Sequence, residues 1–236
     1  AHKGLSFLRV GANAGDGKTA VNAVKMVRRA GLEARYSLMK AYVLTPDELA
    51  AEATMLENAG VQAITIMDSA GYMFPEQAAE YTRKVKSAVS IPVGFHGHSN
   101  LGMAMANAQA AEAAGADFID CGLIGMARSA GNITTEGALA IFQREGKALQ
   151  YDFYALLHFI DDKLMPAMEK EGYHTPIKPL DLILGYAGCH SSFVNTYKEV
   201  AKETGTDLYK LIVETSKRNQ KNPTRELMEE VASSIH

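Results

Sequence analysis

Two histidines, His96 and His98, are separated by one glycine and directly follow the apolar residues 91–95. Residues two apart in an extended strand point to the same side, so the two imidazoles face one side together. Neutral imidazoles bind divalent transition metals, and a carboxylate and waters would complete the coordination shell. The pair therefore predicts a metal site, and the alternative is two polar residues that only end a strand.

Other polar residues also follow apolar runs. Asp68 and Ser69 could orient a substrate acid, although both types are common in ordinary strand-to-helix turns. The small-residue loop 125–132 could bring backbone N–H groups to an anion or let Asn132 reach a metal, unless it is only a flexible connector. Tyr186 could gate a pocket or pass a proton, but tyrosines more often pack with a satisfied hydroxyl.

The elements that position these residues repeat. Five strand-like runs start about 26 to 29 residues apart, which is the length of one strand and one crossover helix. Glycines at 31, 60 and 115 are placed to end helices, and residues 45–48 combine an N-cap, a proline and a capping-box glutamate. The runs are residues 7–12, 34–40, 63–68, 92–98 and 118–123.

This repeat predicts an α/β fold with a parallel sheet covered by helices. Polar residues close almost every strand, and no Gly-x-Gly-x-x-Gly follows the first one. A TIM (β/α)8-type barrel is therefore favoured over a doubly wound open sheet. Five βα units cannot close eight strands, so either three units are absent from this chain or the sheet is open.

The regular alternation of strand-like and helical segments stops after about residue 133. We expect five barrel units in residues 1–149 and a helical extension in residues 150–236 that contacts a partner or another subunit. A proline-containing joint covers residues 174–179, and a polar terminal helix begins at about Thr224.

Composition narrows the ligand class. The net charge of -3 and the scattered basic residues give no reason to expect nucleic acid. No apolar run has membrane-spanning length, and Cys121 and Cys189 lack a paired spacing. We expect a cytoplasmic protein whose ligand is a small molecule or another protein.

The ordered set of motifs resembles the 4-hydroxy-2-oxovalerate aldolase family, within the metal-dependent DRE-TIM lyases that also include hydroxymethylglutaryl-CoA lyase and isopropylmalate synthase. The resemblance rests on residues 68–71, 94–101, 125–126 with 131–132, and 184–188 followed by 191–193. It implies cleavage of a 4-hydroxy-2-oxoacid to pyruvate and a short aldehyde such as acetaldehyde through a metal-stabilised pyruvate enolate.

The resemblance also implies roles for individual residues. His96, His98 and Asn132 would hold a divalent metal, with Mn2+ favoured over Mg2+ or Co2+. Ser69, with Asp68 beside it, would lie at the substrate's pyruvyl end, and Tyr186 would act catalytically at the aldehyde end. An acylating acetaldehyde dehydrogenase would dock on the C-terminal helices and receive the aldehyde.

The sequence departs from the family pattern in two places. The family's first strand ends in Arg-Asp-Gly, whose aspartate is a metal ligand, and a histidine base follows, but neither occurs here. Ala127 and Ser129 replace glycines that are usual in the loop. We therefore expect that the chain starts just before the fourth strand and that it forms homo-oligomers or belongs to a longer natural chain.

Two alternatives stay open. One is a related acyl-CoA lyase or synthase of the same barrel family. The other is a non-catalytic truncated remnant that acts as an interaction module, because the Arg-Asp-Gly strand is missing.

Overall fold

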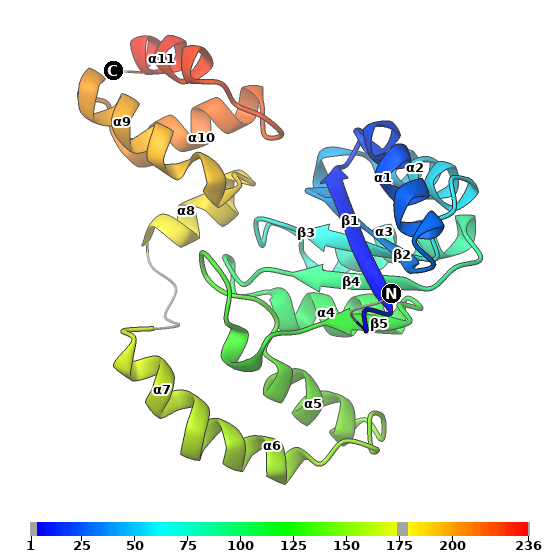
Figure 1. Cartoon of the computed structure of the whole chain (residues 1–236). Coiled ribbons are helices and arrows are strands. Elements are labelled where there is room, and N and C mark those ends of the chain that lie inside the picture. The colour runs from blue at the N-terminus through cyan, green and yellow to red at the C-terminus, as the bar shows by residue number, and fades with distance from the viewer. Residues whose placement is uncertain (1–3, 174–178, 236) are drawn as a thin grey trace.

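Five parallel strands form one sheet in the computed structural model, which describes residues 4–173 and 179–235 and omits the side chains of Pro179, Leu182 and Tyr186 (Figure 1). The strand order is that of the chain, and each strand pairs with the next. The strands are β1 (Phe7–Asn13), β2 (Glu33–Met39), β3 (Ala63–Asp68), β4 (Val93–Gly97) and β5 (Phe118–Asp120).

Four helices connect successive strands, as a parallel sheet requires. They are α1 (Gly17–Arg29), α2 (Pro46–Asn58), α3 (Pro75–Ala88) and α4 (Ala104–Ala113). The short 3-10 turns η1 (Ala41–Val43) and η2 (Leu123–Gly125) follow β2 and β5, and α5 (Thr135–Arg144) follows η2. The predicted α/β architecture of five barrel units is confirmed.

Three strands end earlier than the sequence predicts. The fourth strand was expected to reach residue 98, but β4 ends at Gly97, and His98 pairs with Asn132 instead. Residue 40 was expected in the second strand, but β2 ends at Met39 because Lys40 has a left-handed backbone with φ 54°. The fifth strand was expected to reach residue 123, but β5 ends at Asp120. Beyond Gly122 the chain turns into η2, where Ile124 has φ 48°. Neither left-handed residue can continue a strand.

The predicted helix ends are confirmed. Gly31, Gly60 and Gly115 have φ values of 74°, 105° and 103°, which L residues rarely adopt. Thr45 caps α2 because its hydroxyl accepts the N–H of Glu48 and the Glu48 carboxylate accepts the N–H of Thr45. The local sequence thus fixes where these helices begin and end.

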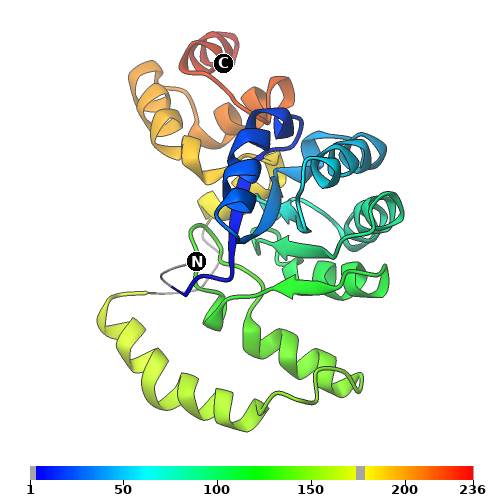
Figure 2. The ribbon, with the colours of Figure 1, turned by 45° about the vertical axis from the view of Figure 1, so that its right-hand side comes forward.

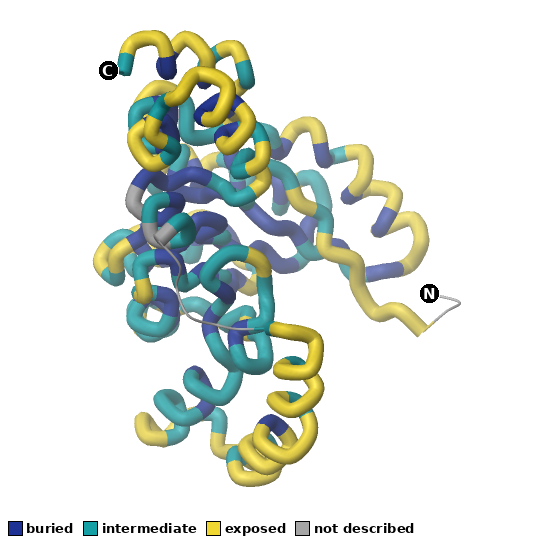
Figure 3. Tube along the Cα trace, turned by 90° about the vertical axis from the view of Figure 1, so that its left-hand side faces the viewer, coloured by how far each residue is buried: buried dark blue, intermediate teal, exposed yellow. Residues whose placement is uncertain are grey.

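The core lies between the sheet and its helices. Tyr36, Leu38, Ile64, Ile66 and Phe95 are fully buried in it. The edge strand β1 is more exposed, and Figure 3 shows the N-terminal part of the chain running outward in yellow. An exposed edge offers unpaired N–H and C=O groups.

The remainder of the described chain is helical, as predicted. A π-helical turn, η3, joins α6 to α7, and these helices are mostly exposed (Figure 3). Residues 174–178 of the predicted joint at 174–179 lie outside the described residues, and Pro179 begins α8. The expected division at residue 150 stays a prediction. The elements are α6 (Phe153–Phe159), η3 (Ile160–Leu164), α7 (Met165–Lys170), α8 (Pro179–Ala187), η4 (Ser191–Phe193), α9 (Val194–Thr204), α10 (Leu208–Arg218) and α11 (Arg225–Ser234).

Helices α8–α11 share a second hydrophobic core that includes Leu184, Tyr197, Leu211 and Met228. They lie beyond the carboxyl ends of the strands, on the side to which the arrows of β3 and β4 point (Figures 1 and 2). Thr224 caps α11, close to the predicted start. Within the described residues, no helix is both long and apolar enough to cross a membrane.

Candidate metal and substrate site

The two histidines lie together at the end of β4, as predicted. The ring centroids of His96 and His98 are 5.4 Å apart. His96 pairs in register with Asp120 on β5, and its Nδ1 is 3.5 Å from Asp120 Oδ2. A carboxylate on one ring nitrogen orients an imidazole so that the other nitrogen faces a ligand.

Asp120 is itself held from the far edge of the sheet. Arg9 on β1 makes a two-pronged contact with its carboxylate, in which Nη2 donates to Oδ1 at 3.0 Å. Burial raises the pKa of Asp120, but the contacts with His96 and Arg9 outweigh burial, so this pKa lies below its usual range. Asp120 is therefore an ionised support for His96.

His98 and Asn132 are brought face to face by the backbone. They form an antiparallel bridge, flanked by hydrogen bonds from Ile133 N to Gly97 O (3.1 Å) and from Ser99 N to Gly131 O (2.8 Å). This is the non-hydrogen-bonded type of pair, in which the two side chains lie side by side on one face.

Both side chains of this pair carry a buried atom without a partner. His98 Nδ1 and Asn132 Oδ1 have no hydrogen-bond partner among the described residues. Buried polar atoms are rarely left unpaired, and an exception has a cause such as an absent water or ion. Here two such atoms face each other beside a second histidine. Burial, together with the nearby His96, lowers the pKa of His98 to about 3, so the imidazole is neutral as a metal ligand requires.

These residues fit a divalent metal as a partial donor set. Two imidazoles and one amide oxygen suit a transition metal and leave positions open for a substrate. Within the part of the chain that the structure describes, no three His, Cys, Asp or Glu side chains are grouped to hold an ion. A carboxylate ligand is therefore not supplied by the described residues.

Asp68 and Ser69 lie at the end of β3, next to β4. Asp68 is fully buried, and its two oxygens accept the backbone N–H groups of Tyr72 (2.9 Å) and Met73 (3.1 Å). Burial raises the pKa of Asp68 to about 6, although the two N–H groups lower it. Ser69 Oγ accepts the N–H of Lys40 at 2.8 Å, which leaves the hydroxyl hydrogen for another acceptor. Asp68 thus shapes the turn that presents Ser69.

Asn100 joins three parts of the site. Its amide nitrogen donates to Ser129 Oγ (2.8 Å) in the loop and to the carbonyl oxygen of Asp181 (2.9 Å) on α8. Ser129, which has φ 59°, donates to Asp181 Oδ1 at 3.0 Å. The loop that follows β5 is therefore anchored rather than a free connector.

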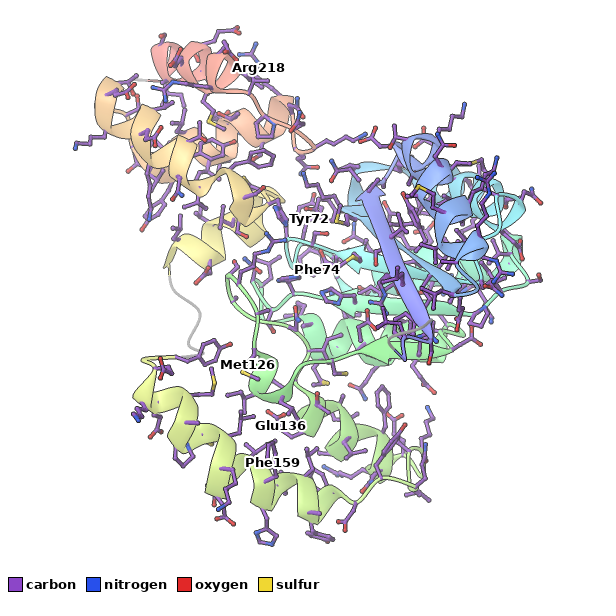
Figure 4. The ribbon with its side chains drawn as sticks, viewed as in Figure 1. Tyr72, Phe74, Met126, Glu136, Phe159 and Arg218 are labelled. Carbon is purple, nitrogen blue, oxygen red and sulfur yellow. The ribbon has the colours of Figure 1, made fainter. Side chains whose placement is uncertain are left out.

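Helix α8 packs closely against the histidine segment. A Cβ on Gly185 would lie 2.7 Å from Asn100 Cβ, and one on Gly188 would lie 3.2 Å from the ring of Tyr72. Figure 4 shows Tyr72 between the strand ends and α8. Tyr186 belongs to α8, but its side chain lies outside the described residues, so its role stays a prediction.

Lys40 directly follows β2, and the local sequence marks it only as a polar residue at a strand end. It is 5% exposed, and its Nζ donates to Lys221 O at 2.5 Å and lies 4.9 Å from the ring centre of Phe193. Burial lowers its pKa. Neither its burial nor its left-handed backbone has a signal in the local sequence.

Comparisons with known proteins agree with this fold and with the family that the sequence resembles. The profile of the HMGL-like family matches residues 15–162. The 4-hydroxy-2-oxovalerate aldolase of Brevibacillus brevis is 31% identical over 98% of this chain and 67% of its own length. The enzyme of that name from Moorella thermoacetica is 33% identical over 97% of this chain and 67% of its own.

The fold is also found in a solved structure. The carboxyl transferase domain of Rhizobium etli pyruvate carboxylase aligns with all of this chain over 43% of its own length, with a TM-score of 0.80. The sequence identity is 15%, so this similarity shows the fold alone. The chain spans about two thirds of the length of the curated relatives that it matches, which are named as aldolases and hence as lyases. The chain therefore belongs to the HMGL-like family and, within it, to the relatives of the 4-hydroxy-2-oxovalerate aldolases.

Proposed function

We propose that this chain carries the metal and substrate residues of an aldolase that cleaves 4-hydroxy-2-oxoacids, such as 4-hydroxy-2-oxovalerate, to pyruvate and a short aldehyde. The observation that carries the proposal is the pairing of His98 with Asn132, whose buried unpartnered atoms lie on one face beside His96. The names of the curated relatives support the reaction class.

His96, His98 and Asn132 would hold the metal, and Mn2+ is the proposed ion, with Mg2+ or Co2+ as substitutes. A bound divalent cation supplies Lewis acidity toward the 2-oxo group and the negative charge that develops there as the C–C bond breaks. The ion pair of Asp120 with Arg9 keeps His96 oriented.

The remaining residues would act on the substrate. Ser69 donates its hydroxyl hydrogen to the oxoacid, because its oxygen is fixed by the N–H of Lys40. Asp68 acts through the turn, because both its oxygens accept backbone N–H groups. Tyr186 is proposed to act at the aldehyde end. The 4-hydroxyl proton needs a base, and none is assigned to the described residues.

The partner and cellular context are part of the same proposal. The aldehyde would pass to an acylating acetaldehyde dehydrogenase that docks on α8–α11, in a cytoplasmic homo-oligomer. The resemblance of the motifs supports this assignment.

A non-catalytic remnant is the second candidate. The observation in its favour is that the described residues supply no carboxylate to the two histidines. A remnant would keep the fold and the C-terminal helices as an interaction module.

Mn2+ titration with calorimetry, together with an assay of pyruvate release from 4-hydroxy-2-oxovalerate, separates the two. We expect Mn2+ binding that is at least about tenfold weaker in His98→Ala and Asn132→Ala, because each loses a ligand. His158→Ala is the matched control, because His158 is exposed on α6. A wild-type chain that neither binds Mn2+ nor releases pyruvate would be a remnant.

A further inference from the structure

The ammonium group of Lys40 is buried, and it has no anionic partner in residues 4–173 and 179–235. Lysines are almost never fully buried unless they are paired. Here Nζ contacts a neutral carbonyl, Lys221 O, and the ring of Phe193, and no carboxylate among the described residues lies within ion-pair distance. An ammonium group has three N–H donors, so Lys40 keeps a donor for a further acceptor.

Arg128 is a second cation in the same region. It lies in the loop that Ser129 anchors to Asp181, and its side chain has neither an ion pair nor a hydrogen bond within the described parts of the chain. Burial lowers the pKa of Lys40 most, and the cations Lys221 and, to a smaller extent, Arg128 lower it as well. Burial also lowers the pKa of His190, and both Arg128 and Lys40 contribute to that shift. Lys40, Arg128 and His190 therefore lie in one region of the structure.

The nearby carboxylates already have partners. Asp68 accepts two backbone N–H groups, Asp16 pairs with Lys221, and Asp120 pairs with Arg9. Asp181 accepts a hydrogen bond from Ser129. Lys40 also has a left-handed backbone, a strained conformation that tends to cluster at functional sites.

We infer that Lys40 and Arg128 form an anion subsite at the carboxyl ends of the strands, beside Ser69 and the two histidines, that binds a carboxylate of the substrate. The inference rests on the proposed function, because that function supplies a 2-oxoacid to this edge of the sheet. The carboxylate is either that of the oxoacid itself or a second one on the aldehyde half, as in a 4-hydroxy-2-oxo dicarboxylic acid.

Calorimetric titration of the full chain in EDTA, with pyruvate and with 2-oxoglutarate as probes, tests the subsite without a metal. We expect Lys40→Met and Arg128→Ala each to weaken binding about tenfold or more, because a hydrogen bond to a charged group is lost. Lys84→Met and Arg144→Ala are matched controls on the outer helices α3 and α5, and both should bind as the wild type does.

The two probes identify the source of the carboxylate. If 2-oxoglutarate binds more tightly than pyruvate and the variants remove that difference, the subsite holds a second carboxylate. If both acids bind equally and both weaken, it holds the carboxylate of the oxoacid. Wild-type protein that binds neither acid, or variants that bind both as tightly as wild type, would overturn the inference.

A conservative variant and a measurement of thermal unfolding distinguish loss of binding from loss of folding. Lys40→Arg keeps the charge and should retain binding, and Arg128→Ala removes an exposed side chain. Thermal unfolding checks that each variant is folded. Mn2+ binding by the wild-type chain is scored separately. Wild-type protein that binds Mn2+ but neither acid rejects the subsite alone, and wild-type protein that binds the acids but not Mn2+ rejects the metal site alone.

Discussion

Replacing Asp68 by asparagine should change how the stability of the protein depends on pH. Asp68 is fully buried, and burial raises its pKa from 3.8 to about 6, although Tyr72 and Met73 donate backbone N–H groups to it. The folded state therefore binds the carboxyl proton more tightly than the unfolded state does. The resulting stability is complete below pH 3.8 and is lost as the pH rises through about 6.

The size of the effect follows from this shift. About two pKa units correspond to about 3 kcal/mol over the whole titration. Between pH 5 and pH 7 the folded carboxyl loses most of its proton, so about 1.3 kcal/mol of stability should disappear in that interval. An asparagine side chain does not titrate, so the free energy of unfolding of Asp68→Asn lacks this component.

Urea unfolding followed by circular dichroism at pH 5, 6 and 7, with EDTA present, measures the difference. The gap in unfolding free energy between wild type and Asp68→Asn should change by about 1.3 kcal/mol across the series, in the direction that favours wild type at pH 5. Asp161→Asn, which replaces an exposed aspartate in η3, is the control and should follow wild type. Parallel curves for wild type and Asp68→Asn would refute the reasoning.

Three substitutions test the local geometry. Thr45→Ala should cost about 1 kcal/mol in urea unfolding because α2 loses its N-cap, and an unchanged midpoint would contradict that role. Gly71→Ala should lower the free energy of unfolding by at least about 1 kcal/mol, because Gly71 has φ 59° and an added Cβ would lie 2.5 Å from Asn100 N and 2.7 Å from His98 O. The same substitution should weaken Mn2+ binding, and a normal Mn2+ affinity would show that this turn does not position the metal site. Gly185→Ala should lower stability by about 1 to 3 kcal/mol because its Cβ would overlap Asn100, and a more stable variant would show that α8 is not tightly packed there.

Local signals allowed much of the fold to be predicted. The apolar runs located all five strands, and glycines at 31, 60 and 115 marked helix ends because their φ values are positive. The early ends of the second and fifth strands were missed because a lysine or an isoleucine gives no sign of a left-handed backbone. Tertiary packing imposes that conformation on Lys40 and Ile124.

The site was predictable only in part for the same reason. The spacing of His96 and His98 placed both rings on one side, as the ring distance confirms. The contact between Arg9 and Asp120 joins residues 111 positions apart, so no local pattern could reveal it. The partners of Lys40 are likewise distant, and only the folded arrangement shows that its ammonium group is buried.

The sequential strand order has a consequence for synthesis on the ribosome. Each strand pairs with the strand translated just before it, so the sheet can grow one unit at a time as the polypeptide emerges. Lys40 is an exception, because Phe193 and Lys221 are translated long after it. During synthesis, Lys40 therefore stays in contact with water at the edge of the partly formed sheet until the C-terminal helices fold over it.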